Sequence, residues 1–226
     1  MVSFTTRHII ILLLLFQAAI GFAQNNVLSE VNINRKSVYV GQPVEVSVGI
    51  FTPTWFTKGV NFGNIKVNGA FTVYFRSVST SKKINGKNYA GVVAIYNVFP
   101  YDDDDLVFPS LEMVVETPDE GGFKGIKRSV KTKSRNIDVK AVPNGYNAND
   151  WLVANNVNVN ESWQGDLKTV KVGDVVQRTV YRKVYGTVSE LIPPVSWDSI
   201  QGVSIYPTRS SINTEKTKTA ISAIRT

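Results

Sequence analysis

The sequence predicts an all-β protein, because three of its features favour strands over helices. Apolar and polar residues alternate over short segments, most clearly at 44–51, where every second residue is valine or isoleucine. Turn-forming residues separate these segments, and the pair Asn85-Gly86 is a strong signal for a hairpin. No stretch keeps the 3.6-residue period of an amphipathic helix. Many short strands with regular turns indicate β-sandwiches of immunoglobulin-like topology.

A short signature occurs twice in the chain. Residues 38–44 (VYVGQPV) and 170–176 (VKVGDVV) both follow the pattern V-x-V-G-x-x-V. A glycine between β-branched residues is typical of a turn that joins two short strands. The spacing between the two copies fits the length of a small domain and is too long for a solenoid repeat. We therefore predict two tandem β-domains.

The predicted strands fall into two modules, with a turn-rich linker at 143–150 between them. The first module, 24–142, holds strand candidates at 31–34, 44–51, 72–78, 89–98, 110–116 and 136–140. The second module, 151–226, holds strand candidates at 157–160, 169–172, 175–185 and 202–208. We expect two immunoglobulin-like sandwiches, the second one truncated, since 217–226 has the pattern of a strand without a closing signal. Modules of this size bury a core of their own.

Residues 1–23 have the pattern of an export signal. Arg7 gives a positive start, residues 9–16 are apolar without interruption, and G-F-A at 21–23 places small residues where a signal peptidase cleaves. An uncleaved anchor is the alternative, but the apolar run is shorter than the ~20 residues that span a bilayer. We therefore expect cleavage after Ala23 and a protein that is exported to the periplasm or cell envelope.

The composition excludes several classes of chemistry. The chain has no cysteine, and its single histidine, His8, lies in the predicted signal. Catalysis by Ser-His-Asp or Cys-His groups, thiol redox chemistry, and metal sites built on His or Cys are therefore excluded from the exported protein. We predict a protein that is not an enzyme, with no catalytic residue, no cofactor and no metal site. Its stability must come from its core, because disulfides cannot form.

The order of short motifs along the chain carries a family resemblance. The first module supplies V-x-V-G-Q-P-V at 38–44, the Asn-Gly hairpin, Y-N-V-F-P at 96–100 and L-V-F-P at 106–109. The second module supplies D-W-L-V-A at 150–154, V-x-V-G-D-x-V-x-R-T at 170–179, L-I-P-P at 191–194 and V-S-I-Y-P at 203–207. In this order and spacing, the chain resembles the BatD family, the oxygen-tolerance proteins of bacterial cell envelopes.

The resemblance to the BatD family implies an exported, β-rich protein that is anchored by a membrane helix near its C-terminus. It also implies contacts with von Willebrand factor A-type or tetratricopeptide proteins of the envelope, a link to aerotolerance or stress survival, and no catalytic residues. The chain departs from this pattern, because no second apolar segment of spanning length follows the signal. Membrane attachment is therefore expected only if the natural chain continues beyond Thr226.

Trp55 and Phe56 are the first candidates for partner binding. They follow a predicted strand, in the segment T-P-T-W-F-T at 52–57. Exposed aromatic side chains in a sandwich loop anchor partners well, because they offer a large apolar face and lose little conformational freedom on binding. The alternative is that Trp55 folds back to cover the core.

Four consecutive carboxylates form the second candidate, and they belong to Asp102, Asp103, Asp104 and Asp105. With the BatD resemblance in view, they could contact the metal-centred surface of a von Willebrand A-type partner. Calcium also binds carboxylate oxygens, but neighbouring side chains in extended backbone point in opposite directions, and the spacing differs from that of a calcium loop. A solvated turn is the interpretation that we favour.

The formal net charge of the chain is +7, and basic residues cluster only at 124–135. Charges on an edge strand or hairpin prevent edge-to-edge pairing of sheets. The functional alternative is a patch for anionic lipid or glycan, which together with Trp55 would make a surface glycan-binding or adhesin-like module. No motif for nucleic-acid recognition is present, so no nucleic-acid partner is expected. Trp151 and Trp163 are expected to seal the core of the second module.

Overall fold

The computed structural model describes residues 27–217 and 219–226, and the predicted export signal lies outside these residues. Strands make up 48% of the structure, and the helical part of what is described consists of two short 3-10 turns, η1 (Ala148–Asp150) and η2 (Ser189–Leu191). The predicted all-β class is confirmed. No helix in these residues has the length and the apolar character needed to cross a membrane.

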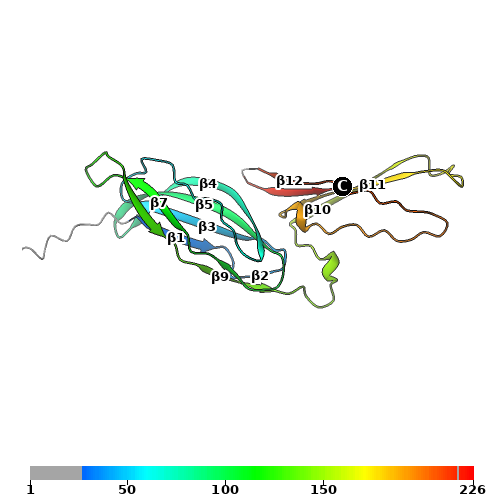
Figure 1. Ribbon diagram of the computed structural model, residues 1–226, viewed down its shortest axis with the longest axis horizontal. Coiled ribbons are helices and arrows are strands. Elements are labelled where there is room, and N and C mark those ends of the chain that lie inside the picture. Colours follow the sequence, from blue (N-terminus) through cyan, green and yellow to red (C-terminus); the bar gives the residue numbers. More distant parts are fainter. Residues whose placement is uncertain (1–26, 218) are drawn as a thin grey trace, which may run out of the picture.

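Strands β1 to β9 form a β-sandwich around one core (Figure 1). One layer is an antiparallel sheet with the strand order β1 (Leu28–Ile33), β3 (Val44–Thr52), β5 (Lys87–Pro100) and β4 (Ala70–Ile84). The facing strands are β2 (Ser37–Tyr39), β9 (Arg135–Lys140) and β6 (Leu106–Phe108) in one sheet, with the hairpin β7 (Glu112–Thr117) and β8 (Ile126–Lys131). We call strands β1 to β9 the N-terminal unit.

The sequence of β3 explains its place at the centre of this core. Its valines are fully buried and alternate with the exposed Glu45, so the alternation predicted at 44–51 is confirmed over the first half of the strand. The second half is buried on both faces, and the ring of Phe51 packs over Gly91 of β5. A Cβ on Gly91 would lie only 2.5 Å from the Phe51 Cδ1. The glycine therefore lets an aromatic ring cover the sheet at this point.

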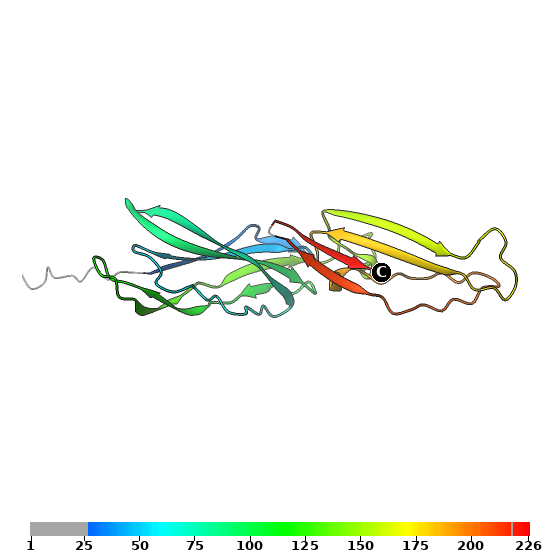
Figure 2. The same cartoon turned by 90° about the horizontal axis from the view of Figure 1, so that it is seen from above.

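Strands β10 to β13 form a separate antiparallel sheet, which we call the C-terminal unit. The strand order is β10 (Asn156–Gln164), β11 (Gln177–Tyr185), β13 (Ile221–Arg225) and β12 (Ile212–Lys216). A small core of Val184, Ile192 and Ala223 forms on one face. Figures 1 and 2 show this sheet continuing beyond one end of the N-terminal unit, so that the two units lie end to end.

The two units share a packed junction. Phe99 of β5 is fully buried in a cluster with Val188 and Ile221 of the C-terminal unit. Trp151, at the start of the predicted second module, donates its indole N–H to the Val40 carbonyl over 2.8 Å. The expectation that Trp151 and Trp163 seal the second core is wrong: Trp151 is bound to the N-terminal unit, and Trp163 is 42% exposed.

The two copies of the V-x-V-G-x-x-V signature have different structures. Gly41 and Gly173 both have positive φ, 74° and 93°, which glycine adopts without strain. The first copy joins β2 to β3 in the opposite layer, whereas the second lies in the loop between β10 and β11. The strand predicted at 169–172 is therefore wrong, as is that at 202–208. Their apolar side chains are exposed to solvent, so no burial favours a strand there.

Candidate partner-binding site

Two aromatic side chains meet on the surface at one end of the N-terminal unit. Trp55 follows β3, and Phe123 lies in the loop between β7 and β8. The ring centroids are 6.1 Å apart with 48° between the planes, and the side chains are 44% and 86% exposed. The ring of Trp55 therefore contacts another exposed ring at the surface.

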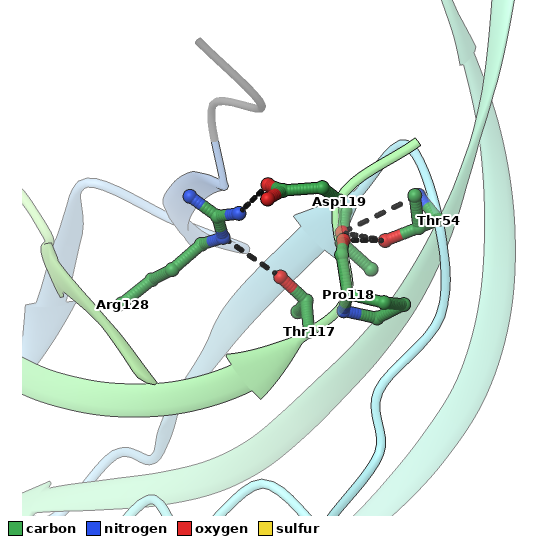
Figure 3. A network of polar contacts seen from close by, with 6 residues as sticks. Thr54, Thr117, Pro118, Asp119 and Arg128 are labelled. Atoms are coloured by element: carbon green, nitrogen blue, oxygen red, sulfur yellow. Dashed lines mark hydrogen bonds and ion pairs between the residues drawn. The ribbon is translucent and has the colours of Figure 1, made fainter. Parts of the chain in front are cut away.

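Hydrogen bonds fix the two loops that carry these rings. The Thr54 hydroxyl donates to the Pro118 carbonyl over 3.1 Å, and the Thr57 N–H donates to the Glu116 carbonyl over 2.9 Å. Figure 3 shows the first of these contacts, with Thr54 beside Pro118. Such bonds limit the movement of the loops, so that binding would cost less conformational entropy.

The base of the β7–β8 loop is held by charged groups. The Arg128 Nε donates to the Thr117 hydroxyl over 3.0 Å, and its guanidinium forms an ion pair with Asp119 (Figure 3). Lys58 lies 2.9 Å from the Glu116 carboxylate. The hydrogen bond from Lys58 lowers the pKa of Glu116 most, and desolvation opposes this effect in part.

Phe56 differs from its neighbour Trp55. Its ring is partly buried and packs against the sandwich core, so its first role is to attach the loop. Beside it lies a shallow depression of about 400 Å³, which the 56–60 segment shares with β4 and β5. The depression gives the unit a concave surface that the Phe56 side chain borders.

The four aspartates lie at the opposite end of the N-terminal unit. Thr52 pairs with Ala90 near the start of β5, whereas Asp102 follows Pro100 at its end. About ten residues of extended chain separate these points, or roughly 33 Å at 3.3 Å per residue. The structure therefore does not bring the aspartates together with Trp55 and Phe56.

Two of the four carboxylates have backbone partners. The Asp104 N–H donates to Asp102 Oδ1 over 3.4 Å, and the Val139 N–H donates to Asp105 Oδ1 over 3.1 Å. The segment forms bends and its side chains are exposed, as the interpretation of a solvated turn predicts. Within the part of the chain that is described, no three His, Cys, Asp or Glu side chains are grouped so that they could hold a metal ion.

Within the basic segment at 124–135, residues 126–131 form β8, one strand of a hairpin as the sequence predicts, and Arg135 begins β9. Two of its cations have partners within the unit: Arg128 is paired with Asp119, and the Arg135 Nε donates to the Val31 carbonyl over 2.8 Å. The lysines remain exposed. The charge that a ligand would meet is therefore smaller than the sequence suggests.

Sequence reasoning missed Phe123, which is the more exposed residue of the aromatic pair. The signal was present, because Phe123 lies in the segment G-G-F-K-G at 121–125. A large apolar residue among glycines has few local neighbours that could bury it. No spacing rule, however, could have paired it with Trp55 across more than sixty residues of chain.

No protein-family model matches this chain, and comparisons with curated proteins and with solved structures also gave no match.

Proposed function

We propose that this protein is a non-enzymatic interaction scaffold of the cell envelope or periplasm that acts through protein–protein contacts. The exposed pair of Trp55 and Phe123, held on hydrogen-bonded loops, is the observation that carries the proposal. Rigid, exposed aromatic side chains are the usual anchors of protein interfaces. A role like that of the BatD family, associated with aerotolerance or stress survival, is supported by the order of motifs in the sequence.

The finer fold assignment belongs to the same proposal. We infer tandem immunoglobulin-like domains at 24–142 and 151–226, with 143–150 as the linker. The packing of two layers in the N-terminal unit and the antiparallel order of the C-terminal sheet support this assignment. Export through a cleaved signal at 1–23 is part of the proposal too, and it rests on the sequence pattern alone.

The partners that we propose are von Willebrand factor A-type or tetratricopeptide proteins of the envelope. Trp55 and Phe123 would insert into an apolar pocket of the partner, with the neighbouring depression receiving a partner side chain. Asp103 and Asp104 would form a separate contact with a metal-centred surface. Their carboxylates have no hydrogen bond or ion pair within the described residues, which leaves them available for such a contact.

The proposal is tested with residues 24–226 as bait for envelope proteins. Enrichment of von Willebrand A-type or tetratricopeptide proteins is expected, followed by measurement of the dissociation constant with the purified partner. Replacing one anchor, by Trp55→Ala or Phe123→Ala, should weaken binding by about thirtyfold, the effect of an interface hot spot. The matched control is Tyr206→Ala, which removes from the C-terminal unit a ring that is as exposed as that of Phe123. Equal affinities for all three variants would contradict the aromatic site.

The aspartate contact needs its own test, since it lies at the other end of the unit. The double variant Asp103→Ser with Asp104→Ser spares the two carboxylates that bind backbone N–H groups. We expect weaker binding of a von Willebrand A-type partner, with the difference lost when the partner's metal is removed by a chelator. Unchanged affinity would exclude the contact.

A glycan-binding or adhesin-like module is the second candidate function. The depression of about 400 Å³ beside Phe56 favours it, because sugars stack on aromatic rings that border a concave surface. Affinity electrophoresis in gels that contain envelope polysaccharide would detect it. Retardation that is lost in Trp55→Ala and kept in Tyr206→Ala would favour this function over the protein scaffold.

A further inference from the structure

Strand β10 is a long sheet edge without the usual protection. It lies at one border of the C-terminal sheet, as Figure 2 shows, and all nine of its residues are exposed. It contains no proline and no lysine, and its register with β11 runs without a bulge from Asn156↔Tyr185 to Gln164↔Gln177. Such an edge leaves a row of backbone N–H and C=O groups that can pair with another strand.

The other long edges among the described strands have features that hinder pairing with a further strand. Strand β4 has a bulge between Tyr74 and Arg76 and carries lysines toward its end. The outer side of β1 is covered, because the Arg135 Nε donates to the Val31 carbonyl over 2.8 Å. Strand β12 is short, and its Lys216 ammonium donates to the Tyr74 carbonyl over 2.7 Å. Natural sheets use these same devices against unwanted pairing, so the bare edge of β10 is the exception.

We propose that β10 pairs with β10 of a second copy of this chain. The two strands would run antiparallel about a two-fold axis at Asn160, the midpoint of the strand, and would join the two sheets into one continuous sheet. This register pairs all nine residues. Besides Asn160 with itself, the opposed pairs are Asn156 with Gln164, Asn158 with Ser162, Val157 with Trp163, and Val159 with Glu161.

The chemistry of the strand is complementary to itself in this register. One face consists of neutral Asn, Ser and Gln side chains, which can hydrogen-bond across the axis. On the other face, Glu161 is the sole charged residue of the strand, and it opposes Val159, not its own copy. It also stays neutralised by Arg178 of the same chain at 2.7 Å. Moving the axis to Glu161 would place two carboxylates opposite each other, which is unfavourable.

The edge of β10 is therefore complementary to β10 of a second copy in both register and charge. The contact is isologous, so it closes at two copies and does not propagate into fibres. It is independent of the Trp55 site proposed above, which lies on the far end of the N-terminal unit. The two proposals can thus fail separately.

The absence of cysteine makes the register directly testable. The variant Asn160→Cys introduces one thiol per chain, and the two-fold axis would place the two Cα atoms about 4.5–5.5 Å apart. This separation lies within the range that a disulfide spans. The matched control is Asn158→Cys, on the same face of the strand, where the two thiols would be offset by four residues, or about 13 Å, and could not be joined.

We expect residues 24–226 without any substitution to show a dimer in sedimentation equilibrium over a range of concentrations. Under mild oxidation, Asn160→Cys should give a disulfide-linked dimer on a non-reducing gel, and Asn158→Cys at least tenfold less of it. A monomer at every concentration, or equal cross-linking of both variants, would overturn the proposal. A strand from another protein as the natural occupant would give the first of these results.

Charge substitutions at the axis provide a second readout that leaves the core intact, because Asn160 is exposed. Asn160→Lys and Asn160→Asp each place like charges opposite each other, and each should raise the dissociation constant about fivefold. Mixing the two variants should restore the dimer, since opposite charges then meet. Failure of the mixture to dimerise better than either variant alone would refute the register, and unchanged circular dichroism would show that both variants are folded.

Discussion

The packed junction between the two units gives the most direct prediction of stability. Phe99 is fully buried there, in contact with a cluster that includes Val188 and Ile221 from the C-terminal unit. The variant Phe99→Ala would remove this ring and leave a cavity between the units. We expect the variant to be less stable and the two units to unfold less cooperatively.

The size of the effect follows from the burial. Replacing a fully buried phenylalanine by alanine costs about 3–5 kcal/mol, which includes the lost transfer free energy and the cavity that remains. Part of this loss falls on contacts that couple the units, because Val188 and Ile221 belong to the C-terminal unit, and the rest falls on Phe71 and Val73 of β4.

Urea denaturation followed by tryptophan fluorescence measures this effect. Trp151 reports on the junction through its hydrogen bond to Val40, whereas Trp163 lies within the C-terminal sheet. One transition is expected for the unsubstituted protein and two for Phe99→Ala. The matched control is Phe123→Ala, which removes the same side chain at 86% exposure and should change stability by less than about 0.5 kcal/mol. A loss in Phe99→Ala no larger than in this control would refute the coupling.

Three further predictions concern other packed or charged positions. Gly125→Ala would place a Cβ 2.6 Å from Glu116 Oε1, and we expect it to lower the free energy of unfolding by about 1–3 kcal/mol in urea titrations. Because the pKa of Glu116 is lowered from 4.5 on folding, its ionisation stabilises the native state above pH 4.5 and this stabilisation is lost as the pH falls further. Thermal melts of Glu116→Gln should therefore show a weaker loss of stability in acid. Burial and then the neighbouring Arg225 lower the pKa of Arg182, which opposes Arg225 across the sheet. Arg182→Met removes this repulsion and should raise stability by up to about 1 kcal/mol, and a destabilised variant would contradict the argument.

The class of the fold and most strands could be predicted from the sequence. The alternating pattern at 44–51 corresponds to β3, and the strand predicted at 89–98 lies in β5. The Asn85-Gly86 pair forms the turn of the β4–β5 hairpin, with φ of 48° and 82°. These features are local, because two neighbouring strands and their turn decide them. The sequence carries such signals wherever one face of a strand is buried.

The loops of the C-terminal unit could not be predicted in the same way. The second V-x-V-G-x-x-V copy has the composition of a strand, but Val172 and Val175 face solvent there. A β-branched residue favours a strand when a neighbouring layer covers it, and this depends on tertiary packing that the local pattern does not contain. The candidate site shows the same limit, since Phe123 contacts Trp55 through the closure of two distant loops.

The two proposed surfaces together would make the protein bivalent. Strand β10 runs along the long axis of the molecule, as Figure 2 shows, so a two-fold axis across it would point the two N-terminal units in opposite directions. Each end of the dimer would then present one pair of Trp55 and Phe123. A partner with two or more pockets on one surface would bind more tightly to the dimer than to a monomer, because the second contact becomes intramolecular. Under the same conditions, Asn160→Lys should weaken capture on a dense partner surface while leaving the affinity of a single site unchanged.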